Sequence, residues 1–475
     1  MTNTVNFDVV VIGGGILGCH AARNLCRWNL SVALIEKEND VCTGITRANS
    51  AIVYAGYDNS PGSLKAQMSV KACTDFDRLC RELEVPFVRR GSLMVSFGPN
   101  ADRVLERKFN HGQLNGVEHL RLISGDEACA MEPMLSSAVT KALYCPSTGT
   151  VNPWQLGIAA FENAVHNGCT PMLNTKVLSI SRHKDHYIIE TDSHSIQCRA
   201  VLNCAGLAAD KIQEMLFAPS VRLFYDASDY IVMDRNAKAP EHIIFHESED
   251  KGKGITAVPA SEGNLLLESP DRALKVEDQT SLSAFSTDAD SLDELRRITG
   301  HVLPGVDFGK TIRTFGTVRP NPHEVIYHDG SWVPNGKSIG SFVISHPAPG
   351  FYSLIGIKTP GITCSDQLGM HLAQNCAEYL GAETNRKFDP HRKAILQPRH
   401  LDFDAQSALT AEDPEYADII CQCEGISRAE IREAILRGAA TLDGVKRRTG
   451  TGMGHCQGSR CSYEIQRMIN ELTSH

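Results

Sequence analysis

The chain has 475 residues, well beyond the roughly 100–200 residues of a typical domain, so the sequence predicts two or three domains with large cores. Its composition, 42% hydrophobic and 22% charged, is ordinary for a globular protein and excludes disordered, collagen-like and coiled-coil chains. The 47 basic and 56 acidic residues give a formal net charge of −9, which argues against nucleic acid as the main partner.

No apolar run approaches the roughly 20 residues that span a bilayer, so no membrane span is expected, although peripheral association stays open. The N-terminal segment lacks the basic region that opens a signal peptide. Twelve of the 16 cysteines are scattered without forming a CxxC pair, which is typical of reduced thiols that pack as small apolar side chains. These features favour a cytoplasmic protein.

The first 36 residues show the pattern of a dinucleotide-binding unit. Residues 7–12 form a β-branched apolar run, typical of a strand buried in a parallel sheet, which leads into the G-x-G-x-x-G motif of Gly13, Gly15 and Gly18. A helix and a second strand follow, and that strand ends in Glu36. A glycine-rich turn alone is also compatible with a purely structural role, but the whole unit predicts a dinucleotide site.

Each residue of this motif has a physical role in binding a dinucleotide. Gly13 permits a tight turn, Gly15 lets the backbone approach the pyrophosphate, and Gly18 lets the helix lie close to the strand. The N-terminus of the helix faces the phosphates with its partial positive charge. Glu36 can accept hydrogen bonds from ribose hydroxyls, and Lys37 beside it is assigned to the same site.

The later sequence favours FAD over NAD as the dinucleotide. Residues 200–210 form another buried strand that ends at Gly206, after an antiparallel excursion at 176–180 and 187–190. FAD proteins of the glutathione-reductase type return to their dinucleotide sheet in this way, and no second G-x-G-x-x-G follows a later strand. We therefore expect an α/β, glutathione-reductase-type FAD-binding Rossmann fold, with Val177 and Gly206 at the cofactor and no pyridine nucleotide as electron partner.

The segment Thr46–Tyr57, TRANSAIVYAGY, resembles the S-K-A-N-S-G-I-x-H-A-G segment of the FAD-dependent glycerol-3-phosphate dehydrogenase and L-2-hydroxyglutarate oxidase families. Both belong to the D-amino-acid-oxidase-like flavoproteins. Residues 90–95, 146–153 and 356–363 also agree, so the resemblance covers roughly residues 5–385. It looks closest to anaerobic-type glycerol-3-phosphate dehydrogenases, and it implies an FAD-binding fold with an interleaved α+β substrate domain.

The resemblance also implies which loop residues approach the flavin. Thr46, Asn49 and Ser50 would lie on a turn and helix start near the pyrophosphate and flavin, and a plain capped helix terminus is the alternative. A second loop follows the strand expected at 351–355 and begins the last long helix at Gly361, whose amides can approach the flavin; a glycine–proline turn is the alternative. The residues assigned to the cofactor in this loop are Gly356, Gly361, Ile362 and Thr363.

Three residues are candidates for the catalytic site. Tyr54 stands where the family commonly has a histidine, and a phenol, with an ordinary pKa of about 10, is a poorer base at neutral pH but can donate a hydrogen bond. Arg319 lies in a segment similar to the G-x-R-P segment of the superfamily, whose arginine holds an anionic substrate. Lys358 is the second candidate cation. The identity of the catalytic base stays open.

The expected domain organisation follows from these motifs. The FAD-binding parts are expected at about 1–85, 145–215 and 320–385, and the interleaved substrate domain at about 86–144 and 216–319. Residues 386–415 are interpreted as a connector and residues 416–475 as a small α-helical domain. Within this last domain, Ser427 and Glu430 form the S-x-x-E capping box of a helix.

The C-terminal segment contains four closely spaced cysteines: Cys421, Cys423, Cys456 and Cys461. Four thiolates suit zinc or an iron–sulfur cluster, and a metal centre would stabilise the thin core of a domain of about 60 residues. Zinc sites favour CxxC pairs, which the CxC and CxxxxC spacings do not match. Residues 449–458, TGTGMGHCQG, resemble bacterioferritin-associated-ferredoxin-like (BFD-like) domains, which implies a 2Fe-2S cluster on the four cysteines; zinc and free thiols remain the alternatives.

These features predict an FAD-dependent dehydrogenase of a small anionic alcohol, with sn-glycerol 3-phosphate, oxidised to dihydroxyacetone phosphate, as the first candidate. FAD would accept the hydride, and the 2Fe-2S cluster would pass electrons to a separate acceptor protein or quinone-reducing subunit. Arg319 and Lys358 would orient the anion. L-2-hydroxyglutarate, another 2-hydroxy acid or an amino acid remains the alternative substrate. A flavin/iron–sulfur electron carrier or redox sensor is the second alternative.

Overall fold

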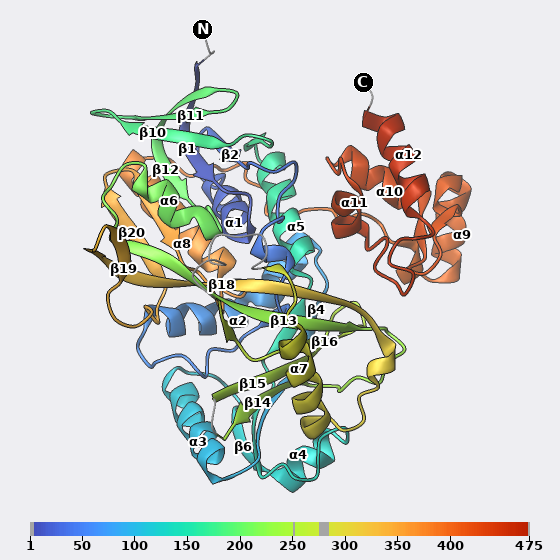
Figure 1. Cartoon of the computed structure of the whole chain (residues 1–475). Helices are drawn as coiled ribbons and strands as arrows, with labels where there is room; N and C mark the ends of the chain where they lie inside the picture. The colour runs from blue at the N-terminus through green and yellow to red at the C-terminus, as the bar shows by residue number, and fades with distance from the viewer. Residues whose placement is uncertain (1–3, 250–251, 275–284, 474–475) are drawn as a thin grey trace.

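The computed structural model describes residues 4–249, 252–274 and 285–473 and shows two large sheets with a separate group of C-terminal helices (Figure 1). The first sheet has the dinucleotide-binding topology predicted from the N-terminal motif. Its central strand β1 (Thr4–Ile12) pairs in parallel with β2 (Val32–Ile35) on one side and β12 (Ser195–Asn203) on the other. The parallel strands β9 (Thr170–Met172) and β21 (Phe351–Ile355) extend the two sides.

The antiparallel excursion expected before residue 200 is also confirmed. Strands β10 (Val177–Arg182) and β11 (Tyr187–Thr191) form a hairpin, and β11 pairs antiparallel with β12. On the same edge of β12 as β11, but nearer the end of the strand, lies β21, which pairs antiparallel with β20 (Val343–Ala348). The strand order β10-β11-β12-β1-β2-β9 places the glycine-rich turn after β1 at the middle of the sheet.

Helices cover both faces of this sheet because β1 buries side chains on both of its faces. Val9 and Val11 belong to the apolar cluster that contains the α1 helix (Ile16–Leu25), whereas Val10 and Ile12 pack on the other face with α6 (Ala209–Glu214). Helix α1 packs between the helices α5 (Pro153–His166) and α8 (Ser365–Leu380). The first face is thus a layer of three helices.

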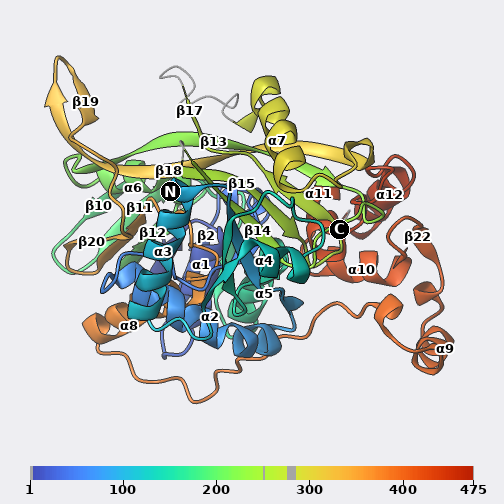
Figure 2. The same ribbon diagram turned by 90° about the horizontal axis from the view of Figure 1, so that it is seen from below.

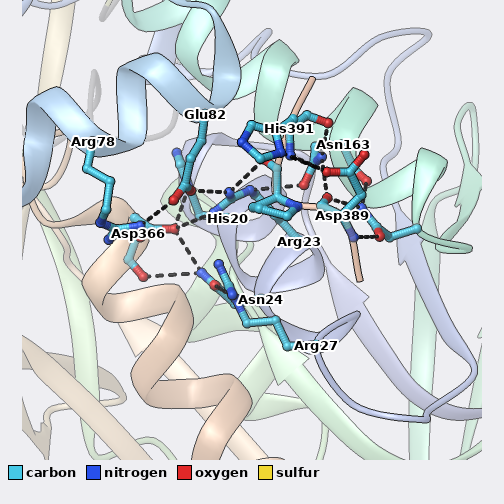
Figure 3. Close-up of polar contacts among 12 residues, drawn as sticks. His20, Arg23, Asn24, Arg27, Arg78, Glu82, Asn163, Asp366, Asp389 and His391 are labelled. Atoms are coloured by element: carbon cyan, nitrogen blue, oxygen red, sulfur yellow. Dashed lines mark hydrogen bonds and ion pairs between the residues drawn. The ribbon is translucent and has the colours of Figure 1, made fainter. Parts of the chain in front are cut away.

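A buried polar network fixes α1 against α8 and the long helix α2 (Leu64–Leu83) (Figure 3). Arg23 of α1 lies 3.3 Å from Asp366 of α8 and 2.8 Å from Glu82 of α2, and His20 Nδ1 lies 3.2 Å from Asp366 Oδ1. Burial raises the pKa of Asp366, but the hydrogen bond and charge of His20 and the charge of Arg23 outweigh burial and hold that pKa well below its usual range. The Asp366 carboxylate is therefore ionised within the network.

The second sheet belongs to the expected substrate domain and has the order β19-β18-β13-β16-β15-β14-β5-β7-β6, with β17 beside β13. The two longest strands of this sheet, β13 and β18, pair antiparallel over nearly the whole length of β13. Strand β14 pairs in parallel with β5 and so joins the two chain segments of the domain. The expected domain border between residues 319 and 320 falls inside β18.

The elements of this second domain have the following bounds. Its strands are β5 (Ser92–Ser96), β6 (Arg121–Ser124), β7 (Lys141–Cys145), β13 (Val221–Met233), β14 (Ile243–Ser248), β15 (Gly252–Pro259), β16 (Leu265–Glu268), β17 (Arg272–Ala273), β18 (Thr311–His328) and β19 (Ser331–Pro334). Its helices are α3 (Pro99–Leu114), α4 (Gly125–Met131) and α7 (Ala289–Val302). A small third sheet consists of β3 (Ile52–Val53), β8 (Gly149–Val151) and β4 (Phe87–Arg89). Its strands occur where the chain passes from the first large sheet to the second and back again. Tyr54 directly follows β3.

The C-terminal helices form a separate lobe beside α5 (Figures 1 and 2). The lobe contains α10 (Arg428–Leu436), α11 (Leu442–Thr449), α12 (Ser462–Thr473) and the hairpin of β22 (Ile419–Cys421) and β23 (Ile426–Ser427). The predicted capping box of Ser427 and Glu430 is present at the start of α10. The expected connector contains the helix α9 (Phe403–Glu412). Within the described ranges, no helix has the length and apolarity needed to cross a membrane.

Candidate functional site

A cavity of about 460 Å³ runs from the glycine-rich turn after β1 to the second sheet. The residues that line it come from the ends of β1, β2 and β12, from the loop before β3, from β18 and from the loop after β21. Most of the residues predicted for the cofactor and substrate lie on its wall: Gly13, Gly15, Glu36, Lys37, Thr46, Asn49, Ser50, Tyr54, Gly206, Arg319, Lys358, Gly361 and Ile362. Ligands bind in this place, at the carboxyl ends of the strands, in open parallel sheets.

The glycine-rich turn leaves no room for a side chain at Gly13 or Gly18. Gly13 has a φ of +103°, and a Cβ atom there would lie 2.6 Å from the carbonyl oxygen of Cys204. A Cβ atom at Gly18 would lie 1.8 Å from the carbonyl oxygen of Gly13, so Gly18 acts by helix–strand packing rather than by lining the cavity. The N–H of Ile16 donates to Thr46 Oγ1 at 3.1 Å, which places Thr46 at the N-terminus of α1.

Two backbone N–H groups hold the Glu36 carboxylate in place. Its Oε2 atom accepts a hydrogen bond from the Gly14 N–H at 2.7 Å, and its Oε1 atom accepts one from the Glu38 N–H at 2.9 Å. The side chain also lines the cavity. Since each carboxylate oxygen has two lone pairs, both oxygens retain capacity for ribose hydroxyls.

Two loops bring the remaining predicted residues together. Asn49 donates to the Thr46 carbonyl at 2.8 Å and accepts from the Ala51 N–H at 2.9 Å, so it shapes its own loop. Thr363 Oγ1 accepts from the Tyr54 N–H at 2.9 Å and ties the two loops to each other. Thr363 therefore supports the site from behind the cavity wall.

Gly356 and Val177 also lie outside the cavity wall. Gly356 has a φ of +65°, and a Cβ atom there would lie 2.6 Å from the Pro322 ring. Val177 is buried in β10, opposite Thr191. Both positions fix the backbone near the site, and their predicted contact with the cofactor stays a prediction.

The expectation that Gly361 begins the last long helix is wrong, because α8 begins at Ser365. The Gly361 N–H donates to the Lys358 carbonyl at 2.6 Å, and the Ser365 hydroxyl donates to the Ile362 carbonyl at 2.8 Å. These short-range bonds close a turn over residues 360–364, which presents Gly361 and Ile362 to the cavity before the helix starts.

A second cavity, of about 330 Å³, adjoins the first on the side of the substrate domain. The two cavities share Tyr54, Arg319 and Lys358, together with Thr359 and Pro360. The three candidate catalytic residues therefore lie where the nucleotide cavity meets the substrate domain.

Arg319 is the centre of a charge cluster with no net charge. Its Nη1 atom lies 2.7 Å from Asp271 Oδ2 and its Nη2 atom lies 2.5 Å from Glu268 Oε1, while Lys253 Nζ lies 3.0 Å from the same Glu268 oxygen. Burial raises the pKa of Glu268, but the charges of Lys253 and Arg319 outweigh burial and lower it to about 2. Sequence reasoning found Arg319 but missed its two carboxylate partners, because they lie about 50 residues upstream without a motif of their own.

Lys65 and Lys358 face the second cavity without a carboxylate partner. Within the described ranges neither lysine forms an ion pair; the Lys358 ammonium donates to Asn321 Oδ1. Burial lowers the pKa of both lysines, and the positive charge of Lys65 lowers that of Lys358 further. Sequence reasoning missed Lys65, since its only signal is a place in the first turn of a helix capped by Ser63.

Two aromatic groups on the cavity walls differ in their capacity to take a proton. Burial, followed by the charge of Glu268, raises the pKa of the Tyr54 phenol well above its ordinary value, so the phenol stays protonated. The imidazole of His246 lines the second cavity, and burial, with a smaller contribution from His301, lowers its pKa to about 4. His246 is therefore neutral at physiological pH, and no motif in the sequence indicated it.

The four C-terminal cysteines lie close together in two pairs. The Cys423 thiol is a close neighbour of the Cys456 thiol, and the Cys421 thiol is a close neighbour of the Cys461 thiol. Burial raises the pKa of Cys456, but hydrogen bonds from Cys423, from two backbone N–H groups and from a serine hydroxyl outweigh burial and lower it. Among the described residues, no group of three or more His, Cys, Asp or Glu side chains converges as for a single metal ion.

Paired thiols suit a 2Fe-2S cluster, because each of its two irons takes two cysteine thiolates. A Cβ atom at Gly454 would lie 2.6 Å from the Cβ atom of Cys423, so the loop before Cys456 approaches the first pair of cysteines only because it carries glycine there. The donor set therefore fits the cluster predicted from the sequence.

Comparisons with known proteins agree with both halves of the chain. Residues 8–375 match the family model of the FAD dependent oxidoreductases (DAO), and residues 419–471 match that of the BFD-like 2Fe-2S binding domain. The chain is 36% identical over 467 residues to a glycerol 3-phosphate dehydrogenase of Caloramator mitchellensis, covering 97% of this chain and 93% of that protein.

Two further proteins extend the comparison. The chain is 25% identical to the anaerobic glycerol-3-phosphate dehydrogenase subunit A1 of Haloferax volcanii, over 98% of this chain and 82% of that protein. The fold is similar to that of an FAD-bound L-alpha-glycerophosphate oxidase from Mycoplasma pneumoniae, with a TM-score of 0.71, 20% identity, and coverage of 82% of this chain and 100% of the other. The chain therefore belongs to the FAD dependent oxidoreductase (DAO) family and carries a BFD-like 2Fe-2S binding domain, with FAD and a 2Fe-2S cluster as its cofactors.

Proposed function

We propose that the protein oxidises sn-glycerol 3-phosphate to dihydroxyacetone phosphate and passes the electrons through its 2Fe-2S cluster to a separate acceptor. The observation that carries this proposal is that Lys65 and Lys358, which form no ion pair with any described residue, both line the cavity that adjoins the nucleotide cavity. The 36% identity to a protein named glycerol 3-phosphate dehydrogenase supports the same substrate. Bound FAD supplies the hydride acceptor.

A phosphate headgroup would relieve the electrostatic conflict between the two lysines. Each lysine has a lowered pKa because it is buried, and Lys358 also because of its cationic neighbour. A phosphate monoester carries about −1.5 to −2 charges at neutral pH and would restore the charged form of both ammonium groups. Arg319, whose charge is already matched by Glu268 and Asp271, would orient the substrate as a fixed hydrogen-bond donor.

Oxidation of the secondary alcohol also requires that the hydroxyl group lose its proton. We assign the acceptance of this proton to His246, because its neutral imidazole lines the same cavity. Tyr54, which stays protonated, would donate a hydrogen bond to the substrate oxygen. The proposal thus gives the two groups different tasks, matched to their protonation states.

The separate acceptor is proposed to be a partner subunit that takes electrons from the cluster and delivers them to quinone. The similarity to a protein named as subunit A1 of an anaerobic dehydrogenase supports a multi-subunit arrangement. We also propose, from the sequence, that the protein is located in the cytoplasm.

The test is anaerobic bleaching of the flavin in the holoenzyme with a panel of substrates. We expect sn-glycerol 3-phosphate to reduce the flavin and L-2-hydroxyglutarate, other 2-hydroxy acids and amino acids to leave it oxidised. Reduction by one of those acids in place of sn-glycerol 3-phosphate would identify a different substrate. A flavin that stays oxidised with every compound in the panel, sn-glycerol 3-phosphate included, would favour an electron carrier or redox sensor.

Matched lysine variants test the headgroup site. Lys65→Met and Lys358→Met should each raise the substrate concentration for half-maximal bleaching by about tenfold or more, as expected for a lost charged hydrogen bond of about 1.5–3 kcal/mol. Lys71→Met is the control, because Lys71 lies on the same helix α2 but is exposed. If the Lys65 and Lys71 variants behave alike, the headgroup does not bind at Lys65.

A further inference from the structure

The C-terminal lobe is attached to the FAD-binding domain through a buried ion triad. Asp40, in the loop after β2, is 1% exposed and lies between Arg447 and Arg448 of α11, which are each 5% exposed. Arg448 binds both carboxylate oxygens, with Nη1–Oδ2 and Nη2–Oδ1 distances of 2.7 and 2.9 Å. Arg447 Nη2 lies 2.6 Å from Oδ2. We call these three residues the docking triad.

The loop that carries Asp40 also holds the glycine-rich turn of the nucleotide site. Glu36 Oε2 accepts from the Gly14 N–H at 2.7 Å, and the Cys42 N–H donates to the Gly14 carbonyl at 2.8 Å. Both backbone groups of Gly14 are thus bound by residues on the two sides of Asp40. The docking triad therefore joins the 2Fe-2S domain to the same loop that positions the candidate FAD ligand Glu36.

A second group of contacts fixes the connector that leads to the lobe. Asn163 of α5 donates to the carbonyl oxygens of Asp389 and His391 at 3.0 and 2.9 Å, and Arg23 of α1 donates to that of Pro390 at 3.1 Å (Figure 3). The neighbouring Glu162 Oε2 atom lies 2.7 Å from Arg392 Nε in the connector. These contacts hold the connector up to residue 392, whereas α11 lies about 50 residues further along the chain.

Among the described residues, two other ion pairs join the lobe to the FAD-binding and substrate domains, but they involve residues outside α11 and arginines that are more exposed than those of the docking triad. Glu162 also receives Arg437 Nη1 at 3.2 Å, and Glu424, which directly follows Cys423, pairs with Arg235 of the substrate domain. Arg437 is 23% exposed and Arg235 is 43% exposed at the side chain. Exposed ion pairs contribute less than buried ones because water and salt screen them.

Removing the Asp40 charge would leave two buried guanidinium groups without their ion-pair partner. Burial raises the pKa of Asp40, but hydrogen bonds and charges from Arg448 and Arg447 outweigh burial and lower it, so the group is an anion in the docked state. Within the described ranges, the Nε atoms of both arginines are already without a hydrogen-bond partner. Two uncompensated buried cations favour separation of the lobe from the loop.

We propose that Asp40 is a positioning residue for electron transfer: it docks the 2Fe-2S domain on the FAD-binding loop and so keeps the cluster within transfer range of the flavin. Asp40 touches neither cofactor in this role, and the inference does not depend on which substrate reduces the flavin. A cluster held by Cys421, Cys423, Cys456 and Cys461 would accept electrons singly from reduced FAD, which gives up two, and would pass each one to an external one-electron acceptor.

The test compares Asp40→Asn and Arg448→Met with the control Asp413→Asn in the full-length holoenzyme. Asp413, at the end of the connector, accepts from Arg432 of α10 at 2.7 Å, so its variant loses a more exposed carboxylate–arginine contact without touching the FAD-binding domain. The flavin is reduced by light with EDTA as electron donor, which supplies electrons whatever the substrate is. Cluster reduction is then followed by electron paramagnetic resonance on frozen samples, and amide hydrogen exchange is measured over α11.

We expect both docking variants to keep the FAD and iron contents of the parent. Their cluster should be reduced about tenfold more slowly or worse, and the α11 amides should exchange about tenfold faster, because the docked population falls. The control should match the parent in both measurements. Cluster reduction at the parent's rate in Asp40→Asn would overturn the inference, and so would loss of FAD or iron from both docking variants, which would assign the triad to folding.

Discussion

Replacing Arg319 by methionine should weaken the fold in a pH-dependent way. The reason is Glu268, which is 1% exposed and keeps its charge through Lys253 and Arg319. The difference between its ordinary pKa of 4.5 and its pKa of about 2 in the folded protein corresponds to about 3 kcal/mol of stability at neutral pH. Lys253 remains in Arg319→Met, so we expect the variant to lose about 1–2 kcal/mol of this stabilisation at pH 7.

The sign of the pH dependence follows from the lowered pKa of Glu268. Because the folded pKa lies below the unfolded one, the stabilisation is complete above about pH 5 and is lost as the pH falls toward 2. In Arg319→Met, Lys253 remains, so the folded pKa of Glu268 rises only part of the way toward 4.5 and less stability remains to be lost at acid pH. The gap between parent and variant should therefore be largest at neutral pH and should shrink toward pH 3.

The assay is urea unfolding of the holoenzyme at pH 7 and pH 3, followed by release of flavin fluorescence. Arg319→Lys serves as the matched variant, since it keeps the charge but loses the planar fork that reaches both Glu268 and Asp271. A destabilisation of equal size at the two pH values would refute the argument, because the lost contact would then be packing rather than charge. Dithionite should still reduce the flavin of the variant, while the substrate should reduce it at least a hundredfold more slowly than in the parent.

Three further outcomes are expected. Glu36→Ala should release FAD on extended dialysis while the fold persists, because it removes charged hydrogen bonds worth about 1.5–3 kcal/mol each; retention equal to the parent's would show that Glu36 is not the ribose ligand. Gly18→Ala should yield protein without FAD, because its Cβ atom would lie 1.8 Å from a backbone oxygen, whereas Gly300→Ala, with no atom within 4 Å, should bind FAD normally; FAD contents are compared by absorbance. Cys421→Ser should lose iron and keep FAD, and stoichiometric zinc in the parent purified without oxygen would contradict the cluster assignment.

The parts of the fold that were predictable from the sequence are those with local signals. The strands expected at 7–12, just before Glu36 and at 351–355 are rich in β-branched and apolar residues, and all three are present as β1, β2 and β21. The capping box of α10 is likewise contained in four consecutive residues. Such patterns report the environment of a segment without any knowledge of its partners.

The contacts that were not predictable join residues far apart in the chain. Asp40 and Arg448 are separated by 408 positions, and neither belongs to a motif. The long strand pair of β13 and β18 was also missed, because both strands mix charged, small and aromatic residues, and the fold buries these side chains only in part. Lys65 became a candidate only when the fold placed it beside Lys358 in one cavity. Motifs therefore located the cofactors, whereas charge balance at the site required the three-dimensional arrangement.

The contacts of the connector determine where the chain can be shortened. The side chain of Asn163 is buried and finds its partners in the carbonyl oxygens of Asp389 and His391, and Arg23, also buried, donates to the carbonyl of Pro390. A chain ending at residue 385 would leave these donors inside the protein with unmet hydrogen bonds, each costing about 1–3 kcal/mol. A chain ending just after Lys393 would keep them paired. A flavoprotein half suitable for separate expression thus includes the start of the connector, and an evolutionary fusion or loss of the 2Fe-2S domain would have its least damaging breakpoint beyond that residue.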